Sequence, residues 1–190
     1  MPFSKDIRRA TVADAPGIAE IYSYYVNNTV ITFELVPPDL AETEKRIAEC
    51  LNSSYEWIVH ENGGKILGFA YYSAFKERKA YDYTCETTVY VHHDFLGKGI
   101  GSALYSRLIE ELKKSKMAVA LACIAIPNDE SVGLHEKLGF KSCGIIKNAG
   151  RKFNRWVDIG YWRLELKNLP EYEPEKKAAA YQGNDDTSQT

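Results

Sequence analysis

Residues 83–115, YTCETTVYVHHDFLGKGIGSALYSRLIEELKKS, carry the strongest structural signal in the chain. Side chains alternate over Tyr83–Val91, which predicts a strand with Glu86 on a face that otherwise carries hydroxyls. A helix is predicted after Gly97–Gly101, because apolar residues follow a 3.6-residue period at Leu104, Leu108, Ile109 and Leu112. Glycines let backbone amides approach a ligand, and a helix N-terminus carries partial positive charge. The segment therefore predicts a pyrophosphate-binding turn.

This turn has two readings when it is taken alone. It binds a phosphate, or it merely packs the helix against the strand. It is not a Walker loop, since no Gly-Lys-Ser/Thr ends it. It also departs from the dinucleotide-binding fingerprint, because Ser102 stands where the third glycine belongs.

Helices and strands are expected on both sides of this segment. A capping box at Thr11-x-x-Asp14 opens a helix that ends near Asn28, and a second helix begins at Asp39. A later short helix is capped by Asn128 or Asp129. Strands are predicted at residues 7–9, 57–61, 66–75, 117–126, 142–147 and 158–166. The apolar run at 117–126 predicts a strand that is covered on both faces.

Composition narrows the class of protein. The chain has 190 residues and is 45% hydrophobic, which is typical of a globular protein. Its formal net charge of −2 excludes an overall positive potential that would attract nucleic acid or an anionic membrane. No apolar leader or membrane span is found, so we expect a cytoplasmic protein. Four scattered cysteines predict reduced, mostly buried thiols and no metal site. One domain is expected over residues 1–166, followed by a loosely held tail over 167–190.

The order of these elements resembles the GNAT N-acetyltransferases. That family carries the signature Gln/Arg-x-x-Gly-x-Gly/Ala, and this chain has Leu96-x-x-Gly99-x-Gly101. Leu96 departs from the signature, but main-chain amides are expected to hold the pyrophosphate. The resemblance implies a mixed α/β fold, with a central twisted and mostly antiparallel sheet that splays at the cofactor site and has helices on both faces. It also implies acetyl-CoA as cosubstrate and no metal.

Three further motifs resemble the phosphinothricin N-acetyltransferase branch of this family, including its members that acetylate methionine sulfone or sulfoximine. They are Glu86-Thr87-Thr88-Val89-Tyr90-Val91, Ile126-Pro127-Asn128-Asp129-x-Ser131-Val132-x-x-His135-Glu136-x-Leu138-Gly139-Phe140, and Ala149-Gly150-x-Lys152-x-x-x-Trp156-x-Asp158-x-Gly160-x-Trp162. The resemblance covers about residues 6–166 and implies acetyl transfer to the α-amine of a small amino acid analogue by a homodimer.

Two residues are the catalytic candidates. Glu86 is a lone carboxylate in mid-strand, and desolvation would raise its pKa toward that of a base for the amine. A structural ion pair with a nearby cation is the alternative. His135 occupies the position at which many relatives place a tyrosine that protonates the thiolate. It is either that acid or a packed, hydrogen-bonded histidine.

The binding candidates fall into two groups. Those expected to hold acetyl-CoA are Val89, Val91, Gly97, Lys98, Gly99, Ile100, Gly101, Ser102 and Asn128. Those expected to hold the amino acid are Phe33, Lys76, Arg78, Tyr81 and Lys152. Arg78 is favoured as the carboxylate anchor because a guanidinium binds a carboxylate with two parallel hydrogen bonds. A solvated surface charge is the alternative for each cation.

Two other functions stay open from the sequence. A catalytically silent acyl-CoA-binding module would need the glycine turn but neither Glu86 nor the basic loop. An acetyltransferase of polyamines or protein N-termini would prefer an acidic groove to a basic pocket, so the cations argue against it.

Overall fold

The computed structural model describes residues 6–169, in which seven strands form one sheet. The strands are β1 (Ile7–Arg9), β2 (Trp57–Asn62), β3 (Lys65–Ala74), β4 (Thr84–Val91), β5 (Val119–Ile126), β6 (Lys141–Lys152) and β7 (Arg155–Glu165). The α-helices are α1 (Ala15–Asn28), α2 (Leu40–Asn52), α3 (Ile100–Lys114) and α4 (Asp129–Lys137). Single 3₁₀ turns lie at Val12–Asp14, Lys79–Tyr81 and His93–Phe95.

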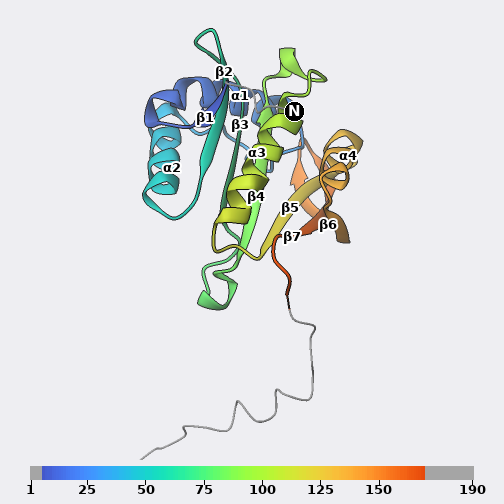
Figure 1. Ribbon diagram of the computed structural model, residues 1–190. Helices are drawn as coiled ribbons and strands as arrows, with labels where there is room; N and C mark the ends of the chain where they lie inside the picture. Colours follow the sequence, from blue (N-terminus) through green and yellow to red (C-terminus); the bar gives the residue numbers. More distant parts are fainter. Residues whose placement is uncertain (1–5, 170–190) are drawn as a thin grey trace, which may run out of the picture.

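The sheet has the order β1-β2-β3-β4-β5-β7-β6 and is antiparallel except between β4 and β5. Figure 1 shows α3 lying across one face of the sheet, with α1 and α2 at the other. Each face has its own apolar core. Tyr105 and Leu108 of α3 are fully buried on one side, and Ile18 of α1 and Ile47 of α2 are buried on the other. The predicted mixed fold with helices on both faces is confirmed.

The parallel pair is the feature that positions the site. β4 and β5 are paired only at Thr84–Val119, Cys85–Ala120 and Glu86–Leu121. Beyond Glu86 the two strands diverge, while β4 stays paired with β3 as far as Val91. The backbone of residues 87–91 therefore presents an edge without a strand partner on the β5 side, which is the predicted splay.

Burial in the second half of the chain differs from the predictions. Ala120, Ala122 and Ile124 of β5 pack under α3, but on the other face of this strand Ala125 is buried whereas Cys123 is exposed. Cys143 is exposed as well, so only Cys85 of the four thiols is fully buried and the prediction of mostly buried thiols is wrong. The predicted strands at 142–147 and 158–166 are parts of one longer hairpin, β6–β7.

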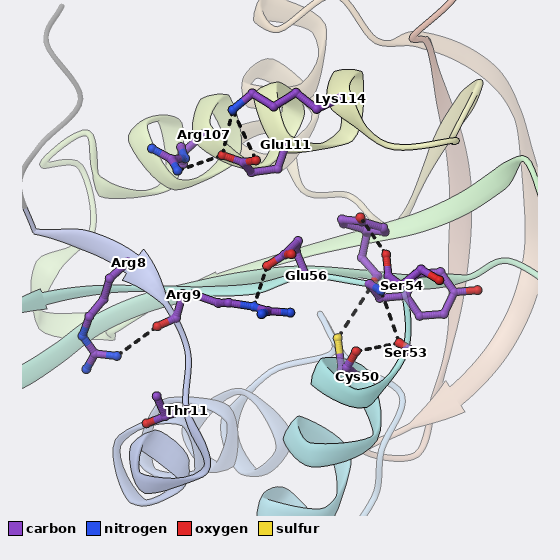
Figure 2. Close-up of polar contacts among 12 residues, drawn as sticks. Arg8, Arg9, Thr11, Cys50, Ser53, Ser54, Glu56, Arg107, Glu111 and Lys114 are labelled. Atoms are coloured by element: carbon purple, nitrogen blue, oxygen red, sulfur yellow. Dashed lines mark hydrogen bonds and ion pairs between the residues drawn. The ribbon is translucent and has the colours of Figure 1, made fainter.

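Polar contacts stabilise the part of the molecule away from the splay (Figure 2). Arg9 next to β2 pairs with Glu56 at 3.0 Å, and Arg107 pairs with Glu111 on the surface of α3 at 2.8 Å. Among residues 6–169 no helix is long and apolar enough to cross a membrane. Most of the predicted tail, residues 170–190, lies outside the described residues.

Candidate active site

The glycine turn has the backbone conformation that the sequence predicts for an anion-binding loop. Gly97 and Gly99 have φ angles of 72° and 81°, which side chains rarely adopt, and open space surrounds the position of a Cβ at either residue. Gly99 is the N-cap of α3, and no side chain caps this helix end. Gly101 is constrained differently, because its Cβ would lie 3.3 Å from Val91 of β4. The first amides of α3 are thus available to a phosphate.

Two cavities meet at the splay. A cavity of about 410 Å³ extends from the glycine turn along β4, and one of about 270 Å³ lies between the diverging strands. They share the lining residues Ile31, Val89, Tyr90, Asn128 and Ser131. A ligand that binds its phosphates at Gly99 can therefore reach Glu86 without leaving the protein surface, because one continuous groove joins them.

Glu86 lies in the wall of the inner cavity. It is half-buried, and burial raises the pKa of its carboxyl above the ordinary value. No cation lies within ion-pair distance of it among residues 6–169. The structural ion pair considered as the alternative role of Glu86 is therefore absent from the described residues. Its carboxylate is instead partly desolvated and faces the cavity.

His135 lines the same cavity from α4 and is only 4% exposed. Its Nδ1 lies 2.7 Å from the carbonyl oxygen of Ser131, and its Nε2 lies 2.9 Å from the hydroxyl of Tyr105. Burial lowers the pKa of His135. Both ring nitrogens have a hydrogen-bond partner, as expected for a packed histidine. His135 also lines the cavity, as expected for an acid that protonates the thiolate.

The loop between α1 and α2 covers the inner cavity. Ile31, Thr32 and Phe33 line it, and the loop is attached to the β6–β7 hairpin at Lys152. The Lys152 side chain is only 3% exposed, and its ammonium donates to the carbonyl oxygen of Thr32 at 2.9 Å. Burial lowers the pKa of Lys152. Its cation therefore lies directly behind the cavity wall.

Steric contact and ion pairs also hold the α1–α2 loop in place. A Cβ at Gly150 would overlap the ring of Phe33, so a side chain at this position would require that ring to move. Arg46 of α2 binds the carboxylates of Glu34 at 2.7 Å and Glu42 at 2.8 Å.

The remaining predicted residues lie elsewhere. Lys76 and Arg78 are exposed in the loop after β3, and Tyr81 packs edge-on against Phe75 in the same segment. None of the three lines either cavity. Lys98 lies in the glycine turn, where its ammonium donates to the carbonyl oxygen of Asp94 at 3.3 Å. The roles assigned to these residues stay predictions.

Sequence reasoning missed several lining residues. Thr32 and Ile31 adjoin the predicted Phe33, and Tyr22 and Tyr71 come from α1 and β3. Ser131 touches both cavities. Its signal was present in the motif around His135, because a residue four positions earlier lies on the same helix face.

The splayed sheet and the helix terminus at Gly99 together form a groove suited to an extended, phosphate-bearing thioester, with the Glu86 carboxylate at its inner end. These features define an acyltransferase. The chain belongs to the GNAT family, since the model described as the acetyltransferase (GNAT) domain matches residues 7–160.

Known relatives agree with this assignment. Phosphinothricin N-acetyltransferase of Streptomyces viridochromogenes is 37% identical over 161 residues, which cover 85% of this chain and 87% of that protein. The L-methionine sulfoximine/L-methionine sulfone acetyltransferase of Pseudomonas paraeruginosa is 37% identical, over 86% of this chain and 95% of that protein. Among solved structures, a phosphinothricin acetyltransferase from Sinorhizobium meliloti in complex with acetyl-CoA superposes with a TM-score of 0.81 at 35% identity, covering 84% of this chain and 86% of that one.

Proposed function

We propose that this protein transfers the acetyl group of acetyl-CoA to the α-amine of a small amino acid of the phosphinothricin, methionine sulfone or methionine sulfoximine type. The continuous groove from the glycine turn to Glu86 is the observation that carries the proposal. The printed names of the relatives supply the substrate class.

The residues present fit acetyl-CoA. The amides from Gly97 to Ser102 bind the pyrophosphate at the N-terminus of α3. The unpaired backbone edge at Val89 and Val91 hydrogen-bonds to the pantetheine and orients the thioester carbonyl. Asn128 belongs to both cavities and borders the point where the thioester lies.

Glu86 acts on the amine. An α-ammonium must lose a proton before it attacks a thioester, and a carboxylate with a raised pKa accepts that proton directly or through a water molecule. Because Glu86 is the last residue of β4 that pairs with β5, the amine is deprotonated where the groove opens into the inner cavity. The amine then attacks the carbonyl carbon, and the thiolate leaves.

Recognition of the amino acid involves the loop over the cavity. Phe33 forms a wall, and Lys152 supplies a buried positive charge for an anionic group once the loop adjusts around Thr32. Arg78 with Lys76 and Tyr81 would complete the binding site from the loop after β3. That loop is separate from the cavity in a single copy of the chain.

A homodimer is part of the proposal. β6 lies at the edge of the sheet, and Ile145 and Ile146 on it are about half exposed. Trp156 on β7 is 63% exposed. A second copy that covers this apolar edge would remove it from water. Sedimentation of the purified protein tests this point, with a mass of twice 21.5 kDa expected.

The test of the proposed function is thiol release from acetyl-CoA with a panel of amines. Phosphinothricin, methionine sulfone and methionine sulfoximine should be acetylated, and spermidine and N-terminal peptides should not. Release only with peptides or polyamines would replace the proposed substrate class. Binding of acetyl-CoA with no release for any amine would favour the silent binding module.

A further inference from the structure

The β6–β7 hairpin is irregular along its length. From Ile146 to Gly150 β6 advances four residues, whereas the paired residues of β7, Ile159 and Val157, are only two apart. β6 therefore carries two extra residues, which form a bulge at 147–149. A bulge bends a strand and increases its twist, so the hairpin changes direction at this point.

The bulge lies where the hairpin leaves the sheet. Asp158 is the single residue of β7 opposite the bulge. It is also paired with Ile126 of β5, and the pairing between β5 and β7 ends at this residue. We call residues 150–157, which extend beyond the end of this pairing, the arm.

The arm contacts the α1–α2 loop at two points. Gly150 packs against the ring of Phe33, and Lys152 donates to the carbonyl oxygen of Thr32 at 2.9 Å. Gly150 and Lys152 are two positions apart in β6, so they lie on the same face of the strand. The direction of the arm therefore determines whether the Lys152 cation lies behind the wall of the inner cavity.

The two ends of the hairpin are fixed independently of the bulge. At the tip, Phe153 and Asn154 have φ angles of 47° and 63°, and Lys152 is paired with Arg155. Positive φ at both central residues is typical of the two-residue turns that close hairpins. At the base, the register is fixed by the pairing of β7 with β5. The extra residues of β6 lie between these ends, where they set the angle of the arm.

The Asp158 side chain holds the bulge. Its carboxylate accepts a hydrogen bond from the backbone amide of Asn148 at 2.8 Å and another from the ammonium of Lys147 at 2.7 Å. Asn148 has a φ of 52°, a left-handed conformation that is uncommon for residues other than glycine. The hydrogen bonds from Lys147 and Asn148 lower the pKa of Asp158, so the acceptor is a carboxylate at neutral pH. Lys147 is 74% exposed, and an exposed ion pair contributes little, so the amide contact is the important one.

We propose that Asp158 is a positioning residue for the amino acid, because it keeps the bulge that aims the arm and Lys152 at the inner cavity. The inference rests on the proposed function and adds to it a residue that acts through Lys152 without touching the amino acid. Asp158 lines neither cavity. Its loss should therefore weaken the binding of the amino acid and leave that of acetyl-CoA in place.

Steady-state kinetics of three variants test the proposal. Asp158→Ala removes the acceptor of the Asn148 amide and should raise KM for methionine sulfone by roughly 10-fold, with KM for acetyl-CoA unchanged. Asp158→Asn retains an oxygen that accepts the same amide and should raise this KM far less. Lys147→Met removes only the ion pair and should leave it unchanged. Equal rises in the two Asp158 variants, or an equal rise in KM for acetyl-CoA, would overturn the proposal.

A double-mutant cycle tests whether Asp158 acts through Lys152. If it does, Asp158→Ala combined with Lys152→Met should have nearly the KM of Lys152→Met alone, because the cation that Asp158 positions is already missing. Losses that multiply would show that Asp158 acts independently of Lys152, and the proposal would be wrong.

The bulge can also be removed without changing Asp158. Deletion of Asn148 and Ala149 restores one-to-one pairing of the two strands and keeps Gly150, Lys152 and the turn. It should raise KM for methionine sulfone as Asp158→Ala does, because the arm loses its bend. A deletion variant with the KM of the wild type would show that the bulge does not position Lys152.

Hydrogen exchange measured by mass spectrometry separates this inference from the proposed function. In Asp158→Ala, residues 147–152 and the α1–α2 loop at 29–36 should exchange faster than in the wild type, whereas α3 should be unchanged. If the wild type acetylates no amino acid analogue, the proposed function fails and the exchange still tests the role of Asp158 in holding the arm. If the wild type is active and Asp158→Ala keeps its KM and its exchange rates, the inference fails alone.

Discussion

Glu86→Gln should weaken catalysis and strengthen the fold at the same time. The carboxylate is half-buried, has no cation partner in the described part of the chain and has a raised pKa. A group whose pKa is raised on folding stabilises the native state below its unfolded pKa and loses that contribution as pH rises through the folded value. At pH 7 the charged Glu86 is therefore a net cost, which a neutral glutamine removes.

The magnitudes follow from the same burial. Each pKa unit by which folding raises a carboxyl is worth about 1.4 kcal/mol at neutral pH, or about 3–6 °C in Tm for a chain of this size, so the direction of the Glu86 shift sets the sign of the expected change. As the pH falls below the ordinary pKa of a glutamate the cost of the charge disappears, so the melting temperatures of the two proteins should converge. Loss of a general base lowers turnover by roughly 10²–10⁴-fold. Thermal melting at both pH values and thiol release from pH 5 to 9 measure these effects.

A matched control separates burial from the loss of any glutamate. Glu56→Gln removes a carboxylate that is paired with Arg9 away from the cavity. It should leave turnover unchanged and lower stability by about 1 kcal/mol at most. A lower Tm for Glu86→Gln at pH 7, with turnover close to that of the wild type, would show that Glu86 is a structural ion-pair residue and refute its role as base.

Three further substitutions test the binding groups. Lys152→Met should raise KM for the amino acid by roughly 10-fold or more, as expected when a charge-assisted hydrogen bond is lost. Lys147→Met on β6 is the control and should leave this KM unchanged. Equal KM values for the two variants in steady-state assays would remove Lys152 from the site. Gly99→Ala forces a side chain into a left-handed conformation at a cost of about 1–2 kcal/mol and should weaken the binding of acetyl-CoA measured by calorimetry. Gly133→Ala on α4, where a Cβ meets open space, should not weaken it. Unchanged affinity in Gly99→Ala would contradict the assignment of the pyrophosphate site. Arg78→Ala should raise KM for phosphinothricin without affecting acetyl-CoA, and an equal loss with a polyamine would show that Arg78 does not recognise the carboxylate.

Local patterns in the sequence were sufficient to predict β4, the glycine turn and α3. Alternation over Tyr83–Val91, the glycines at 97–101 and the helical period after them depend on neighbours within a few residues, so strand β4, the turn and α3 were predictable. The capping signals are equally local: Asn128 caps α4 as predicted, whereas the box at Thr11 caps the 3₁₀ turn Val12–Asp14 and Asp14 is the N-cap of α1.

The inner cavity, which is proposed to bind the amino acid, depends on contacts between residues that are distant in the sequence. Thr32 and Lys152 are 120 positions apart, and only the packing of the α1–α2 loop on the β6–β7 hairpin brings them together. The same holds for His135 and Tyr105, 30 positions apart. The sequence by itself determined the candidate residues, because residue type and local spacing encode the chemistry that a side chain can perform. The tertiary structure decided which of them share a cavity, because the divergence of β4 from β5 after Glu86 arises from the pairing of whole strands.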